Sequence, residues 1–246
     1  ARDELLALID EEAARPAGAH VDAAAAAIRA RGGADVAAIL FYGSGLWQGP
    51  SADQVVDFYV LVDRLRAFEQ GPAAALLNRI LPPNVFYIEV PYAGGMLRAK
   101  YAVLRRDQFR RGASGRTPTP QVWARFAQPC RLVYCRDAVA RDAMVAALAD
   151  AVVTFHRKTL PLLGPRADAR ALWRRGLIET YARELRSEGA ARAEAVYAAA
   201  PEVFARWTRL AVPLAGWPSQ VTREGTIVNE IGKTARCRAG AAARLA

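Results

Sequence analysis

Two short apolar runs on either side of a glycine-serine turn constrain the fold of this chain more than any other feature. The first run, residues 36–42, is rich in β-forming residues and ends at Gly43-Ser44-Gly45, which predicts a buried strand followed by a tight turn. The second run, residues 57–63, predicts another strand with Asp57 at its start. Backbone N–H groups and the Ser44 hydroxyl can approach phosphate groups closely in such a turn, because glycine has no Cβ.

A carboxylate at the start of the neighbouring strand can hold Mg²⁺ against phosphates that the turn binds. A Gly-Ser turn followed by a strand that contains aspartate resembles the polymerase-β-like nucleotidyltransferases, although such turns also join strands that bind no nucleotide. That superfamily usually has a second acid two residues after the first, and Tyr59 is at that position here. Asp57 is therefore the first candidate metal ligand.

Two further carboxylates are candidates for a second metal ligand. Asp63 is an even number of residues from Asp57 and shares its strand face, but a rise of about 3.3 Å per residue places it roughly 20 Å away. The ions of a metal pair lie about 4 Å apart, so the better interpretation of Asp63 is a cap on the helix predicted for 64–81. Glu89, in the strand predicted for 85–90, is either a metal ligand or an outward residue of a half-exposed strand.

The positive charge of the chain favours an anionic partner. The formal net charge is +10, and lysine occurs only at Lys100, Lys158 and Lys233. Nucleic acid, acidic lipid and polyphosphate all fit such a surplus, although arginine together with much alanine is also what a GC-rich coding sequence produces. Lys100 falls inside the strand predicted for 96–104, where a charge needs a partner or a wet cleft. It is the first candidate for a phosphate-binding cation, and Arg98 faces the same side.

The coarse pattern predicts an α+β or α/β protein; of the two we expect α+β, with the mixed sheet of a polymerase-β-like nucleotidyltransferase domain. Alanine-rich segments such as 138–153 favour helix, and the predicted strands at 85–90 and 96–104 form a hairpin around Ala93-Gly94-Gly95. A stretch rich in Gly, Ser, Thr and Pro at 110–120 is the expected domain boundary. We expect a nucleotidyltransferase domain at 1–109, a mainly helical domain at 110–215 and a basic segment at 216–246.

Several segments together resemble the mitochondrial-type CDP-diacylglycerol synthases, the phosphatidate cytidylyltransferases of the Tam-type translocator-maintenance family, which also occurs in bacteria. The resemblance covers roughly residues 36 to 246. It departs from the family pattern at Ala102, where glycine is usual, and at Gln128, where lysine is usual. The segments that carry it are Tyr42-Gly43-Ser44-Gly45 with Gln48, the strand 57–63, 97–103, Trp123 with 125–129, 218–225 and Gly232-Lys233.

The resemblance implies a polymerase-β-like domain followed by a helical, winged-helix-like domain. It implies that CTP and phosphatidate give CDP-diacylglycerol and pyrophosphate in phospholipid biosynthesis, with Mg²⁺ as cofactor. A phosphate monoester has a second pKa of about 6, so this nucleophile needs no general base. The implied residues are Asp57, Lys100 and Ser44 for catalysis; Tyr42, Gly43, Ser44, Gly45, Arg98, Arg125 and Lys233 for nucleotide binding; and Asp57 with Glu89 or Asp63 for the metal.

The C-terminal residues 222–246 are basic, and Val228, Ile231 and Ala235 recur at helical spacing. This pattern predicts a basic amphipathic helix that binds an anionic membrane surface, or a helix that packs on the protein. The three cysteines show no pairing or metal spacing, and no apolar run reaches the roughly eighteen residues of a membrane span. We expect a cytoplasmic protein, peripheral on the inner face of the membrane.

Two other functions fit the same residues. One is a polymerase-β-like transferase with another acceptor, RNA or a small molecule, although no basic stretch with interleaved aromatic residues offers the stacking platform that nucleic acid needs. We therefore expect no nucleic acid partner. The other is a degenerate protein that binds a nucleotide or an acidic membrane without turnover, which the missing acid at Tyr59 would explain.

Overall fold

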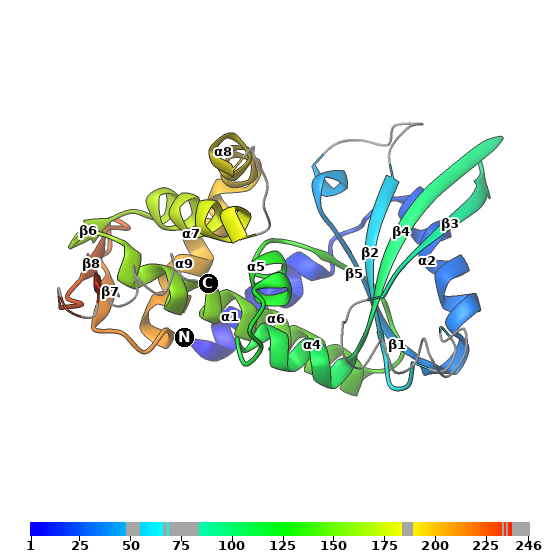
Figure 1. Cartoon of the computed structure of the whole chain (residues 1–246), viewed down its shortest axis with the longest axis horizontal. Coiled ribbons are helices and arrows are strands. Elements are labelled where there is room, and N and C mark those ends of the chain that lie inside the picture. Colours follow the sequence, from blue (N-terminus) through cyan, green and yellow to red (C-terminus); the bar gives the residue numbers. More distant parts are fainter. Residues whose placement is uncertain are drawn as a thin grey trace. The chain divides into compact units, whose positions relative to one another are not determined.

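The computed structural model describes residues 1–47, 55–65, 68, 84–183, 189–232, 234 and 236–237. The chain divides into two compact units (Figure 1). The sheet unit contains Ile9–Arg111 and Pro129–Ala147, and the helical unit contains Ala1–Leu8, Gly112–Gln128 and Leu148–Ala246. The chain first passes from the helical unit to the sheet unit at residues 8–9, and its second passage, at residues 111–112, lies beside the boundary expected from composition. The chain then returns to the sheet unit for residues 129–147.

The α+β class and the mixed sheet are confirmed. The five-stranded sheet has the order β3-β4-β2-β1-β5, in which β2 and β4 are parallel and the other neighbours are antiparallel. The four predicted strands are present, within three residues of the predicted ends. The strands are β1 (Val36–Tyr42), β2 (Val55–Val62), β3 (Asn84–Tyr92), β4 (Gly95–Arg105) and β5 (Arg131–Cys135).

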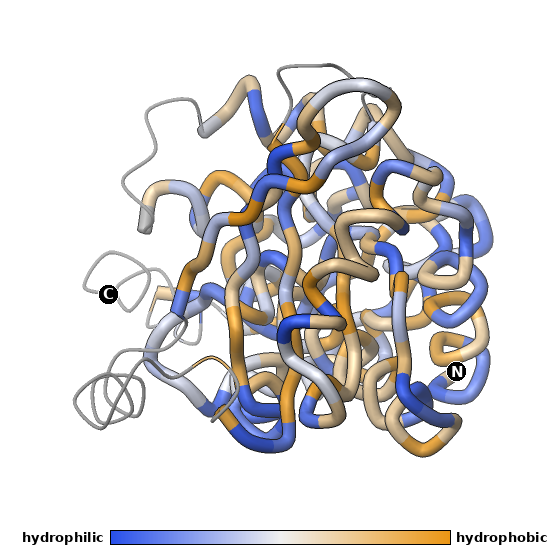
Figure 2. The backbone as a smooth tube through the Cα atoms, turned by 90° about the vertical axis from the view of Figure 1, so that its right-hand side faces the viewer, coloured by the Kyte–Doolittle hydropathy of each residue, from blue (hydrophilic) through white to orange (hydrophobic). Residues whose placement is uncertain are grey.

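One face of the sheet packs against helix α2 (Ala19–Gly32). Alternate strand residues point to opposite faces, and on this face they are apolar, so the face and the helix exclude water together. Along the described residues, apolar stretches alternate with hydrophilic ones (Figure 2). The core includes Val21, Ala24 and Ile28 of α2 with Ile39, Phe41, Phe58, Val60, Ala99 and Tyr101 of the strands.

One expectation for the middle of the chain is wrong. The segment 110–120 is not all loop, because α4 (Arg106–Ala113) continues through its first residues. Within the region 110–215, which was expected to be mainly helical, β5 pairs with β1 in the main sheet. The buried Arg131 at the start of β5 donates to the buried Glu12 carboxylate at 2.8 Å, a partner too distant in sequence for a local pattern to reveal. The helix predicted for 64–81 lies almost entirely outside the described residues.

The helical unit is built around an aromatic cluster. The Trp173 ring lies 4.4 Å from the Phe155 ring and 4.4 Å from the Phe204 ring, measured between centroids. His156 is buried beside them, and its two ring nitrogens lie 2.8 Å from the Val152 oxygen and 3.2 Å from Thr208 Oγ1. Burial lowers the pKa of His156 to about 4, so it is neutral at physiological pH. The remaining helices are α1 (Arg2–Ala13), α5 (Gln121–Phe126), α6 (Ala138–Thr159), α7 (Ala169–Arg183), α8 (Gly189–Ala199) and α9 (Pro201–Leu214).

The C-terminal segment forms part of a second, three-stranded sheet. Its strands are β6 (Arg166–Ala167), β8 (Ile227–Asn229) and β7 (Ser219–Val221), in the order β6-β8-β7. The expectation of an amphipathic helix is therefore wrong at Val228, which lies in β8. Gly225 has a φ of 87° in the turn before this strand, a conformation that ends a helix. Residues 233, 235 and 238–246 lie outside the described part.

Candidate active site

The candidate site lies on the sheet face opposite α2. Strand register places Tyr42 opposite Asp57, Asp57 level with Lys100, and Lys100 opposite Tyr87. Partners in register point to the same face. We call these four residues the cross-strand row. Sequence reasoning found three of its members and missed Tyr87, because the hairpin register that places it beside Lys100 is not visible in a local pattern.

Asp57 and Lys100 lie close enough for an ion pair. The distance between Lys100 Nζ and Asp57 Oδ1 is 3.7 Å, and the side chains are 51% and 34% exposed, respectively. Both groups therefore keep contact with water, and a pair of this kind contributes little to stability. They place a cation and an anion side by side where a phosphorylated ligand can reach them.

The glycine-serine turn lies next to the same carboxylate. Gly43 has a φ of 90°, which glycine adopts more readily than any other residue, and a Cβ on it would lie 3.7 Å from Asp57 Oδ2. Ser44 begins the short 3-10 helix η2 (Ser44–Leu46), closed by the Leu46 N–H donating to the Gly43 carbonyl at 3.2 Å. The structure thus brings Gly43, Asp57 and Lys100 together.

Tyr59 fills the position at which a second acid would be expected. Its side chain is 1% exposed, and its ring lies 5.4 Å from the Tyr42 ring in an edge-to-face arrangement. An aspartate there would place a carboxylate in a buried, largely apolar layer, which is unfavourable without a partner. The packing of the two tyrosines is a physical reason for an aromatic residue at position 59.

Glu89 lies away from Asp57. It is opposite Arg98 in the β3–β4 hairpin, two residues along β4 from the Lys100 position. Two strand spacings and two residues correspond to a backbone separation of about 12 Å from Asp57. Glu89 Oε1 instead lies 3.7 Å from Arg98 Nε and accepts a hydrogen bond from the Tyr87 hydroxyl at 3.0 Å.

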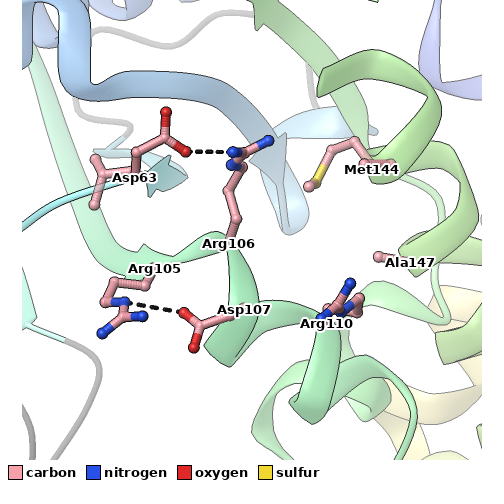
Figure 3. Close-up of a pocket in the computed structure, with 9 residues that line it drawn as sticks. Asp63, Arg105, Arg106, Asp107, Arg110, Met144 and Ala147 are labelled. Atoms are coloured by element: carbon pink, nitrogen blue, oxygen red, sulfur yellow. Dashed lines mark ion pairs between the residues drawn. The ribbon is translucent and has the colours of Figure 1, made fainter. Parts of the chain in front are cut away.

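Asp63 lies beyond the far end of β2 and binds two arginines. Its carboxylate lies 2.5 Å from the Arg106 guanidinium and 2.6 Å from that of Arg136. Figure 3 shows the pair with Arg106. Burial acts to raise the pKa of Asp63, but the Arg136 hydrogen bond and the Arg106 charge outweigh it and hold the pKa below its usual value. The structure therefore gives this carboxylate an arginine-pairing role at the opposite end of the strand from Asp57.

The other candidate residues are not placed at this site. Arg125 is in the last turn of α5 in the helical unit, and Lys233 lies outside the described residues. Arg98 remains beside the site, on the same face of β4 as Lys100. Within the sheet unit, the candidate site consists of the turn, the cross-strand row and Arg98.

Asp57 can serve as a carboxylate ligand for Mg²⁺ that arrives with phosphates. In the described part of the chain, no three His, Cys, Asp or Glu side chains form a group able to hold a metal ion. Mg²⁺ usually binds through one or two carboxylates together with substrate phosphates and water, so one partly exposed carboxylate beside the turn fits that role. Glu89 and Asp63 do not add a second carboxylate at this position.

Comparison with known proteins adds nothing further to this geometry. Neither a protein-family model nor a curated protein matches the chain. Among the described residues, no helix has the length and apolar character needed to cross a membrane. Any function must therefore be argued from the residues of the site.

Proposed function

We propose that this chain is a nucleotidyltransferase that transfers the cytidylyl group of CTP to phosphatidate and releases pyrophosphate. We also propose that the sheet unit has the polymerase-β-like fold. The observation that carries both proposals is the contact between the Gly43 turn, Asp57 and Lys100 at one exposed place on a mixed sheet. A phosphate-binding turn, a carboxylate and a cation are the groups that this reaction requires.

Each group has a defined part in the proposed reaction. The turn and the Ser44 hydroxyl bind the phosphates of CTP, and Lys100 neutralises negative charge as the transition state forms. Asp57 would hold the magnesium ion, which would supply further neutralisation of the phosphate oxygens. A phosphate oxygen of the acceptor bonds to the α-phosphorus while the bond from that phosphorus to the bridging oxygen breaks, and pyrophosphate leaves.

A phosphomonoester acceptor is consistent with the residues around the site. Its second pKa of about 6 leaves it largely dianionic at neutral pH, so no side chain must remove a proton. The cross-strand row contains no histidine, and the buried His156 belongs to the helical unit. An alcohol acceptor would require a base or a second metal-bound oxygen, and Tyr59 stands where the second acid would be.

Exposed apolar residues beside the cations support a lipid as the carrier of that phosphate. Val85 is 65% exposed, Tyr87 50% and Met96 50%, all on the β3–β4 hairpin. They share the sheet face of Arg98 and Lys100. Apolar side chains next to cations suit the surface of an anionic membrane, so we place the protein peripherally on the inner face of the cytoplasmic membrane.

One observation favours a second candidate. With Tyr59 in place of the second acid, the same site could bind a nucleotide or an acidic membrane without turnover. An RNA or small-molecule acceptor is a third candidate, which the tyrosine disfavours for the reason given above. These candidates differ in the products that each would form.

The test is an incubation with Mg²⁺, phosphatidate vesicles and each of the four labelled nucleoside triphosphates in turn. The proposal predicts label in the lipid phase with CTP, dependent on Mg²⁺. Nucleotide binding without lipid label for any triphosphate would favour the non-catalytic candidate. Label on RNA or on a water-soluble alcohol, with none on lipid, would identify a different acceptor.

A further inference from the structure

A pocket in the sheet unit lies at the end of β2 away from Asp57. It has a volume of about 320 Å³, and its walls come from β2, from β4 with the start of α4, and from α6 (Figure 3). Asp63 marks its position, six residues and roughly 20 Å along the strand from Asp57. The pocket is therefore separate from the candidate active site. The polar residues that line it are Asp63, Arg105, Arg106, Asp107 and Arg110.

Positive charge exceeds negative charge around this pocket. Asp63 pairs with Arg106 and Arg136, and a second carboxylate, Asp107, pairs with Arg105 at 3.0 Å and Arg111 at 2.9 Å. Each carboxylate thus forms ion pairs with two guanidinium groups. The net charge of these arginine and aspartate side chains stays positive when a third nearby acid, Asp137, which pairs with Arg136, is included.

Arg110 has its guanidinium available. It lines the pocket, its side chain is exposed, and it forms no ion pair within the part of the chain that the structure describes. Arg106 and Arg110 are four residues apart on α4 and lie on one face of that helix, a spacing at which like charges repel. An anion between them would remove that repulsion and use donors that the carboxylates leave unoccupied.

The remaining wall is apolar and made of small or flexible residues. Ala143, Met144 and Ala147 of α6 line this side, and Figure 3 shows Arg110 close to Ala147 with Met144 across the open space. Alanine side chains leave room for a ligand. The volume is at the lower end of the range for small-molecule sites, and the planar fork of arginine matches phosphate oxygens.

We propose that this pocket binds a compact phosphorylated small molecule, with two linked phosphate groups held by Arg106 and Arg110. The donors are the guanidinium N–H groups, and the acceptors are phosphate oxygens. Asp107 also lines the pocket and would repel an anion if it were unpaired, but Arg105 and Arg111 neutralise it. This site is additional to the proposed nucleotide site and does not depend on the transferase activity.

The test is calorimetric titration of the full chain with pyrophosphate, in low salt and without divalent cations. The starting protein is Lys100→Gln, in which the turn and Asp57 have lost their neighbouring cation. We expect saturable binding of one pyrophosphate per chain. Adding Arg110→Gln should lower the affinity about tenfold or more, because charge-assisted hydrogen bonds are lost. Arg110→Gln breaks no ion pair among the described residues, so the fold should survive, which circular dichroism and the melting temperature check.

Arg116→Gln is the matched control, because Arg116 is exposed, lies outside the pocket and belongs to the helical unit. It should leave pyrophosphate affinity unchanged. Three results would overturn the proposal: no saturable binding to the Lys100→Gln protein, equal affinity with and without Arg110→Gln, or equal losses for Arg110→Gln and Arg116→Gln. A loss of pyrophosphate binding with Lys100→Gln alone would assign the anion to the sheet face instead.

Discussion

At the scale of single residues, the proposed reaction depends on Asp57 beside Gly43 and on the half-exposed Lys100 near Asp57. Their 3.7 Å separation joins neighbouring parallel strands. Parallel pairing of β2 with β4 could not be predicted from the sequence, because residues 66–83 leave the direction of the connection open. It could be predicted that Lys100 has a polar partner or contact with water, because a charge inside an apolar strand needs one.

Lys100→Gln should abolish most of the proposed activity without affecting stability. Because the lysine is half-exposed, loss of its ion pair should change the free energy of unfolding by well under about 1 kcal/mol. Loss of a cation aimed at developing phosphate charge should lower turnover by about a hundredfold or more. Turnover of labelled CTP and thermal melting measure the two effects. Lys158→Gln, an exposed lysine in the helical unit, is the control.

Asp63→Asn should act on stability and leave turnover near the wild-type rate. The substitution removes ion pairs with two partly exposed arginines, so we expect a loss of about 1 kcal/mol. The pKa of Asp63 is lowered in the folded protein. Its contribution is therefore present above the ordinary Asp pKa of about 3.9 and is lost as pH falls through the folded value.

Urea unfolding from pH 7 to pH 3 checks this dependence. The wild type should lose more stability than Asp63→Asn below about pH 4, so that the two curves converge in acid. Curves that stay parallel to pH 3 would contradict the assigned role. A loss of turnover as large as that of an Asp57 variant would indicate that Asp63 is a metal ligand.

At the scale of elements, alternation and turn chemistry predicted most of the sheet. The four strands around the site were predicted from short apolar runs and glycine turns, but β5 was not predicted. It is five residues long and begins with the buried Arg131. The partner of this arginine, Glu12, comes from a helix 119 residues earlier. The spacing of Val228 and Ile231 suggested a helix, but β8 pairs with strands on both sides and satisfies its backbone there.

The contact between α6 and α7 requires a glycine. A Cβ on Gly176 would lie 2.3 Å from Phe155 Cζ and 2.5 Å from Thr159 Oγ1. Both neighbours are buried, so they cannot move aside freely. Gly176→Ala should therefore destabilise the protein by about 1–3 kcal/mol, through overpacking.

Thermal melting with Gly189→Ala as the control tests this contact. A Cβ on Gly189 would have its nearest neighbour at 3.9 Å, on Tyr181, so that variant should melt at or slightly above the wild-type temperature. If Gly176→Ala melts within a degree or so of the wild type, the contact between α6 and α7 does not require a glycine.

At the scale of the whole molecule, the division into two units could be predicted only in part. The composition of residues 110–120 indicated the passage at 111–112. The return of the chain to the sheet unit at residues 129–147 could not be predicted. The helices α1, α4 and α6 each run from one unit into the other without a break in helical pattern. The net charge of +10 predicted an anionic partner in general terms, and the structure gathers part of that charge around the pocket at Asp63.

In the proposed reaction, Asp57 beside the Gly43 turn supports cytidylyl transfer to a lipid phosphate. The most direct measurement compares wild type, Asp57→Asn and Asp142→Asn for transfer of label from CTP to phosphatidate vesicles with Mg²⁺. Asp142 is an exposed aspartate of α6 within the sheet unit. Label should appear in the lipid with the wild type and with Asp142→Asn. Asp57→Asn should lose about a hundredfold or more at an unchanged melting temperature. Equal transfer by Asp57→Asn and the wild type would contradict the account.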